Sequence, residues 1–296
     1  MSSSIVLSKP KHRENLNRRH MKARLFAQIC GCVTWLGTAL LLLLLYQIFS
    51  DGLRWLDWDF LNSFPSRFPE RAGIKSALAG TIWLIGLVAL FSIPVGVATA
   101  IYIEEFGKKN WLARIIELNI SNLAGVPSIV YGIIGLTIFV RGLNLERSLI
   151  SGALTMSLLI LPVIIIASRE AIKTVPLGIR SAALALGVTK WQTVWSHVLP
   201  ASLPGILTGV ILALSRAIGE TAPLLMIGAL TYVAFVPEGP MDSFTALPIQ
   251  IFNWVARPQE EFHQLAAAAI MVLLIALLAM NSIAIFIRHK MEKKLQ

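Results

Sequence analysis

Hydrophobic and polar positions fall into long blocks along this chain, without the short periods that are typical of a soluble protein. Six apolar blocks are close to the length of about 20 residues that crosses a bilayer, and they carry almost no charge. The sequence therefore predicts an all-α polytopic membrane protein with six transmembrane helices. We expect these at residues 25–49, 78–103, 120–140, 149–167, 206–230 and 265–287. The first block is longer than the core of a secretory signal and lacks a small-residue cleavage site, so we interpret it as an uncleaved span.

The composition agrees with this interpretation. Of the 296 residues, 56% are hydrophobic and 14% are charged, whereas a soluble domain is about 25% charged. The two cysteines, Cys30 and Cys32, both lie in the first apolar block and have neither a disulfide framework nor a zinc-ligand spacing. We expect them to be small packing residues.

The net charge of +10 is better explained by topology than by nucleic-acid binding, because basic residues favour cytoplasmic segments. With the amino terminus inside, the inner segments hold eighteen Lys and Arg residues and the outer segments seven. We predict that both termini are cytoplasmic. The predicted tails are residues 1–24 and 288–296, the first periplasmic loop is residues 50–75, and a long cytoplasmic excursion is residues 169–204.

Two other polar segments carry aromatic residues, which gather at membrane interfaces. In the loop at residues 50–75, side chains such as Phe60 are expected to lie against the lipid headgroups. Near the carboxyl terminus, residues 247–255 are expected to form a short interfacial helix that contains Trp254. Residues 104–118 are expected to be a short cytoplasmic loop.

The cytoplasmic excursion has the signals of two short helices. Pro176 suits the first helical position, and the Ala- and Leu-rich stretch that follows favours a helix. Gly187 suits the left-handed position that ends it. Thr189 and Gln192 have the spacing of a capping box for a second helix, which we expect prolines 200 and 204 to end. From the residues alone, docking on a partner and lying along the membrane are both open.

Arg216 and Glu220 are the charged residues of the fifth apolar block, and they are four residues apart on one helical face. Because an ionised group at the bilayer centre costs at least ~2.5–3.5 kcal/mol, we expect them to line a polar path. An Arg guanidinium matches an oxyanion with two parallel hydrogen bonds. A structural ion pair between helices is the alternative interpretation.

Several catalytic motifs are missing from the sequence. It has no Gly-x-x-x-x-Gly-Lys-Ser/Thr phosphate loop, no His-Glu-x-x-His and no Gly-x-Ser-x-Gly. We therefore expect no enzymatic activity, no catalytic residue, no metal and no cofactor, and we expect any ATP hydrolysis to occur in a separate subunit.

The excursion resembles the loop shared by permease subunits of ATP-binding-cassette importers. That pattern is Glu-Ala-Ala, three residues, Gly, nine residues, then Ile-x-Leu-Pro. The matching positions are Ala182, Ala183, Gly187, Leu199 and Pro200, while Ser181 stands in place of the Glu and His197 in place of the Ile. The resemblance implies that this loop docks on an ATPase subunit and transmits its motion.

The run from Arg216 to Leu225, Arg-Ala-Ile-Gly-Glu-Thr-Ala-Pro-Leu-Leu, is similar to PstA-type permeases of phosphate importers. Tyr102-Ile-Glu-Glu-Phe-Gly107 and Pro127-Ser-Ile-Val130 support the resemblance, which covers about residues 76–287. It implies a type I importer permease domain over those residues, in the inner membrane, with Arg216 and Glu220 on a phosphate path. Arg169, after the proline of the fourth span, is a weaker candidate for a second basic contact.

The same resemblance implies the partners. They are a second, related permease subunit of PstC type, two ATP-binding subunits, a periplasmic phosphate-binding protein and membrane lipid, without nucleic acid. A permease for sulfate or molybdate, and a membrane scaffold or signalling subunit that transports nothing, are the alternatives.

Overall fold

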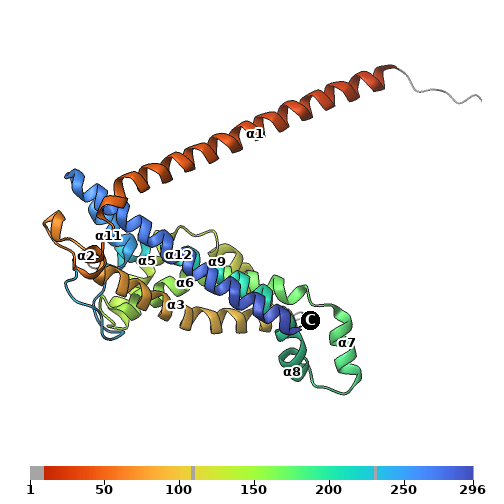
Figure 1. The fold of residues 1–296 in the computed structure, drawn as a ribbon. Coiled ribbons are helices and arrows are strands. Elements are labelled where there is room, and N and C mark those ends of the chain that lie inside the picture. Colours follow the sequence, from red (N-terminus) through yellow and green to blue (C-terminus); the bar gives the residue numbers. More distant parts are fainter. Residues whose placement is uncertain (1–9, 108–110, 230–231, 296) are drawn as a thin grey trace, which may run out of the picture. The chain divides into compact units, whose positions relative to one another are not determined.

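The computed structural model describes residues 10–107, 111–229 and 232–295 (Figure 1). It divides into two units, Met1–Asp51 and Gly52–Gln296. The described part of the first unit belongs to one long helix, α1 (Pro10–Gly52), which contains the predicted first span. Cys30 and Cys32 are exposed on this helix.

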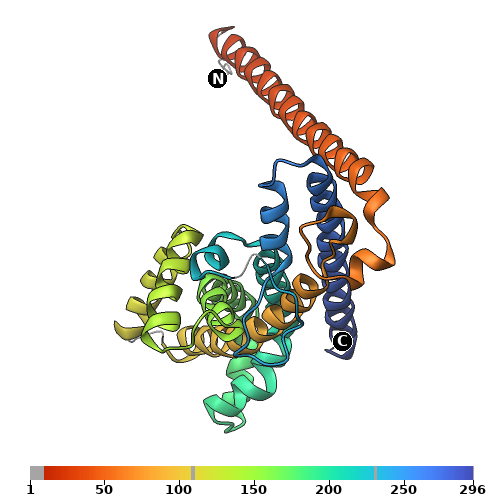
Figure 2. The same cartoon turned by 90° about the vertical axis from the view of Figure 1, so that its left-hand side faces the viewer.

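The second unit is built on helices that run alongside one another, α3 (Lys75–Ile101), α6 (Leu149–Lys173) and α9 (Leu199–Gly219). Helix α12 (Glu260–Leu295) packs against α9 (Figures 1 and 2). Small residues allow α6 and α9 to approach closely, as is common between membrane helices. A Cβ atom at Gly209 would lie only 2.3 Å from the Cβ of Ala167, and one at Gly205 would lie 2.7 Å from that of Ala171.

Within the described ranges, five helices are long and apolar enough to cross a membrane, and a bent pair of shorter helices makes a sixth candidate span. The predicted all-α polytopic class is therefore confirmed. The bent pair differs from the prediction, because the loop expected at 104–118 and the single span expected at 120–140 are wrong. The chain instead forms α4 (Trp111–Leu123), α5 (Ser128–Gly135) and a π-helical extension, η4 (Leu136–Gly142).

The axes of the α4 and α5 segments differ in direction by 108°. Pro127 precedes α5 with an extended ψ of 138°, which interrupts the helix at this point. The phenol of Tyr131 donates a hydrogen bond to the carbonyl of Leu123 at 2.8 Å. The backbone N–H of Val126 donates to the same carbonyl at 3.1 Å, so the end of α4 is capped by two donors.

The predicted fifth span, residues 206–230, is also wrong in its second half. Helix α9 ends at Gly219, and Glu220 has an extended ψ of 125°. After this break the chain forms a short helix, α10 (Ala222–Ile227), which ends at Gly228 with φ +85°. Helix α10 packs against α5, so the segments that follow the two breaks lie together.

At the start of α9 the helix is longer than expected. The chain forms α8 (Lys190–Thr193), a π-helical turn η5 (Val194–Val198) and α9 without a break. The prediction that Pro200 and Pro204 end a helix is wrong. Pro200 lies just after the π-helical turn, in the first turn of α9, and Pro204 lies inside that helix. Neighbouring groups allow such prolines in membrane helices.

One end of the second unit carries short elements: η1 (Leu53–Trp55), α2 (Trp58–Asn62), η2 (Pro69–Arg71) and α11 (Leu247–Val255). Helix α11 has the predicted bounds. Phe60 and Trp254, however, are buried and pack against each other with ring centroids 6.0 Å apart and ring planes tilted by 36°. Their predicted place among lipid headgroups is wrong, because both rings pack inside the protein. The opposite end carries α7 (Leu177–Ala185) and α8 (Figures 1 and 2).

Candidate transport and coupling sites

Arg216 and Glu220 form an ion pair at the break after α9. The Nε atom of Arg216 lies 3.2 Å from Oε1 of Glu220. The predicted pairing is confirmed, although the pair spans the end of a helix and does not lie within one. The side chain of Arg216 is 51% exposed and that of Glu220 is 19% exposed. In this protomer, the guanidinium therefore has open space beside it for a further anionic partner.

The predicted coupling helices are confirmed as helices. Pro176 precedes α7, one residue earlier than its predicted place inside the helix. Gly187 has φ +80°, the left-handed conformation that was predicted. The capping box before α8 is complete, since the side chains of Thr189 and Gln192 each accept from the backbone N–H of the other. We call residues 177–193, which comprise α7, α8 and the turn between them, the coupling segment.

The residues of the importer-loop pattern do not share one surface. Ser181, Ala182 and Gly187 are exposed, whereas Ala183 is buried. Leu199 and Pro200 are half-buried in the first turn of α9. Large apolar side chains of the coupling segment are also exposed, namely Leu177, Ile179, Leu184, Leu186 and Trp191. An exposed apolar patch of this kind is typical of a surface that another protein covers.

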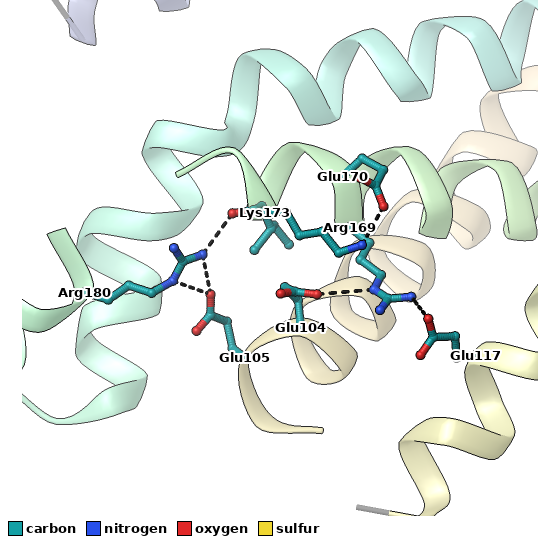
Figure 3. A network of polar contacts seen from close by, with 8 residues as sticks. Glu104, Glu105, Glu117, Arg169, Glu170, Lys173 and Arg180 are labelled. Carbon is teal, nitrogen blue, oxygen red and sulfur yellow. Dashed lines mark hydrogen bonds and ion pairs between the residues drawn. The ribbon is translucent and has the colours of Figure 1, made fainter. Parts of the chain in front are cut away.

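Behind this surface, an ion pair holds the coupling segment to the end of α3 (Figure 3). The end of α3 continues as a π-helical turn, η3 (Tyr102–Phe106), which presents Glu104 and Glu105. Oε1 of Glu105 accepts from two nitrogens of Arg180, at 2.9 and 2.8 Å. The side chain of Glu105 is buried, with an exposed fraction of 7%, and that of Arg180 is largely buried, with an exposed fraction of 13%.

A second set of ion pairs lies beside the first. Arg169 donates to Glu104 at 3.3 Å and to Glu117 at 2.5 Å (Figure 3). These two carboxylates occupy its guanidinium, so the structure favours a role for Arg169 in joining α3, α4 and α6 over a role on the anion path. Lys173 pairs with Glu170 on the same helix at 2.7 Å.

The sequence interpretation missed the roles of Glu104, Glu105, Glu117 and Arg180. The two adjacent acids at the end of an apolar block were an available signal, because ionised groups beside a membrane span need partners. Among the described residues, no group of three or more His, Cys, Asp or Glu side chains is placed to hold a metal ion.

Comparison with known proteins places this architecture in a family. The profile of the family described as "Binding-protein-dependent transport system inner membrane component" matches residues 92–293, more than half of the chain. The chain belongs to this family. It is a permease subunit of an ATP-binding-cassette importer, a multi-pass protein of the inner membrane, and not the ATPase. Importer permeases assemble with ATPase subunits and binding proteins.

Relatives with curated names support this assignment. The chain is 32% identical to phosphate transport system permease protein PstA 1 of Mycobacterium tuberculosis strain H37Rv, over 79% of this chain and 75% of that protein. It is 33% identical to phosphate transport system permease protein PstA of Yersinia pestis, over 83% of this chain and 85% of that protein. It is also 29% identical to the probable ABC transporter permease protein YqgI of Bacillus subtilis strain 168, over 94% and 98%.

Solved structures share the fold. A chain of a bacterial importer of the acidic polysaccharide alginate matches with a TM-score of 0.64 and 15% identity, over 95% of this chain and 99% of that one. A chain of the inward-facing MetNI methionine transporter matches with a TM-score of 0.60 and 17% identity, over 74% and 94%. The type I importer permease fold predicted from the sequence is therefore confirmed.

Proposed function

We propose that this chain is a permease subunit of an ATP-driven importer of inorganic phosphate. The observation that carries the proposal is the similarity to several proteins named as phosphate permeases, at about a third identity over most of the chain. The site supports it, because Arg216 offers a half-exposed guanidinium at a break in a membrane-spanning segment.

The chemistry of the pair suits a phosphate ion. A guanidinium binds two oxygens of an oxyanion through parallel N–H groups. Glu220 neutralises Arg216 when the path is empty, which offsets the cost of an unpaired charge in the membrane. When phosphate displaces Glu220, the carboxylate is free to accept a proton from a protonated phosphate oxygen. Fully ionised sulfate has no such proton to donate.

The coupling segment is the proposed docking element for the ATPase subunits. Its exposed apolar side chains and the residues of the importer-loop pattern support this role. The positive-inside count supports a cytoplasmic place for the segment and for both termini. Under this topology α2 and α11 belong to the periplasmic end, which is the end that a phosphate-binding protein would approach. A related permease chain would complete the path.

The test is uptake of labelled phosphate by proteoliposomes that contain the assembled complex. Wild-type, Arg216→Lys and Arg216→Gln complexes are compared, with sulfate and molybdate as competitors. We expect phosphate uptake that neither competitor blocks, and loss of uptake in both variants with assembly intact. Uptake of sulfate or molybdate in place of phosphate would contradict the substrate assignment. Normal transport by Arg216→Gln would show that Arg216 does not bind the anion on its path.

A scaffold without transport activity is tested by the same preparation. An Arg216→Ala subunit is expected to assemble with its partners and to lose uptake. If the wild-type complex binds its partners and responds to phosphate but moves no anion, the chain is a scaffold or signalling subunit.

A further inference from the structure

Glu105 lies where α3 meets both helices of the coupling segment. It is the fourth residue of the π-helical turn η3, and it is buried in spite of its charge. A buried carboxylate needs a charged partner and hydrogen bonds to offset its loss of water. Both helices of the coupling segment supply such contacts.

The first contact comes from Arg180 in α7. Besides its two contacts with the carboxylate, the guanidinium donates to the carbonyl of Val175 at 2.5 Å and to that of Ile172 at 2.9 Å. These carbonyls lie at the carboxyl end of α6, where helical carbonyls lack partners and favour a cation. Arg180 therefore joins the start of α7, the end of α6 and the end of α3 through one planar group.

The second contact comes from Lys190, the first residue of α8. Its ammonium group donates to the backbone carbonyl of Glu105 and lies 4.9 Å from the centre of the Phe106 ring. The ring of Phe106 is in turn 6.4 Å from that of Trp191. The carboxylate and the carbonyl of Glu105 thus hold the two helices of the coupling segment separately.

We propose that Glu105 is a positioning residue that transmits movement of the coupling segment to α3. Two attachment points from one residue resist rotation as well as translation, so a displacement of α7 and α8 carries the end of α3 with it. Helix α3 packs along α6 and α9, and α9 carries Arg216 in its last turn. The inference rests on the proposed docking role of the coupling segment. It adds the route by which movement of the docked segment is transmitted to the helices that carry the anion path.

Glu104 provides a matched control on the same turn. It is buried to a similar degree, 6% against 7% exposed. Its carboxylate binds Arg169, which lies in α6 and outside the coupling segment. Removing either carboxylate takes an acidic partner away from a largely buried arginine. Only the loss of the Glu105 carboxylate removes an ion pair between η3 and the coupling segment, and the contact of Lys190 with the backbone carbonyl remains.

The experiment measures the phosphate taken up per ATP hydrolysed by the full complex in proteoliposomes with phosphate-loaded binding protein. Wild-type, Glu105→Ala and Glu104→Ala complexes are compared. Damage to folding lowers uptake and hydrolysis together and leaves this ratio unchanged, whereas a loss of transmission lowers the ratio. We expect Glu105→Ala to lower it at least about fivefold, the lower end of typical coupling between sites, and Glu104→Ala to keep the wild-type ratio.

An unchanged ratio in Glu105→Ala, or an equal fall in both variants, would overturn the proposal. If Glu105→Ala fails to assemble, Glu105→Gln and Glu105→Asp replace it. The Gln variant is then expected to lower the ratio and the Asp variant, which keeps the charge, to restore part of it. Equal uptake per ATP hydrolysed in the Gln and Asp variants would contradict the proposal. The wild-type complex alone tests whether the substrate is phosphate. If it carries another oxyanion, the uptake of that ion per ATP hydrolysed still tests the role of Glu105.

Discussion

Two arginine–glutamate pairs in this protein use the same chemical groups in opposite ways. Arg216 and Glu220 are four residues apart, and about half of the Arg216 side chain is exposed. Arg180 and Glu105 are 75 residues apart in the chain, and their side chains are only 13% and 7% exposed. The first pair has one contact at 3.2 Å, while the guanidinium of the second also binds two backbone carbonyls.

The difference shows which pair is able to exchange partners. An exposed ion pair contributes little free energy, so an incoming anion displaces the carboxylate at low cost. A buried pair costs several kcal/mol to break, because each remaining charge is left without water. The exposed pair suits a transport path, and the buried pair suits a fixed mechanical connection.

The largest expected effect is a loss of stability, and it tests directly whether the two pairs differ. Arg180→Ala leaves the Glu105 carboxylate buried without its guanidinium, and we expect it to lower the free energy of unfolding by about 3–5 kcal/mol. Arg216→Ala, the matched control, is expected to lower it by less than Arg180→Ala does, since the Arg216 side chain is about half exposed and makes a single contact with Glu220. The measurement is denaturant unfolding of both variants in detergent micelles. Equal losses would mean that the two pairs have the same structural role.

The local features of both regions could be predicted from the sequence. The Arg216–Glu220 pair follows from a spacing of four residues, and the turn at Gly187 and the capping box at Thr189 follow from near neighbours. Long apolar blocks also identified the spans, because the bilayer requires a minimum length of apolar helix.

The helix breaks could not be predicted in the same way. Gly and Pro occur both inside and at the ends of membrane helices, so Pro94 and Pro162 lie within helices while Pro127 lies at a break. The helices that follow the breaks at 125–127 and 220–221, α5 and α10, pack against each other, and no local pattern reports this contact.

The buried contacts were missed for a related reason. The pairing of Glu105 with Arg180 and the contact between the rings of Phe60 and Trp254 join residues far apart in the sequence. An aromatic residue in a polar loop has the same local pattern whether it meets lipid or another ring, and only the fold decides between them.

The second prediction tests the shape of the buried group. Arg180→Lys keeps the charge but replaces the planar guanidinium with a single ammonium, which cannot reach Glu105 and the carbonyls of Ile172 and Val175 together. We expect a loss of about 1.5–3 kcal/mol, the value of a hydrogen bond to a charged group. Arg216→Lys should unfold like the wild type. A fully stable Arg180→Lys variant would show that charge alone holds the coupling segment.

The third prediction concerns the turn between the two coupling helices. Gly187 has φ +80°, which a β-branched residue adopts at a cost of roughly 1–2 kcal/mol. We expect Gly187→Val to distort the turn and to reduce the stimulation of ATP hydrolysis by the binding protein. Gly178→Ala is the control, because a Cβ there meets no neighbouring atom. Full stimulation in Gly187→Val would contradict the docking role of this segment.

The smallest expected effect concerns the surroundings of the exposed pair, Arg216 and Glu220. Ser215, the residue before Arg216, forms a hydrogen bond of 2.6 Å with Asn281 of α12. Hydrogen bonds between membrane helices contribute about 0.6 kcal/mol on average, so Ser215→Ala should lower stability by about that amount. Ser121→Ala, whose hydroxyl binds a carbonyl of its own helix, is the control. Phosphate uptake by Ser215→Ala is measured as well. If uptake falls far more than the small loss of stability accounts for, the hydrogen bond to Asn281 of α12 fixes the position of the Arg216 guanidinium, although the guanidinium itself is exposed.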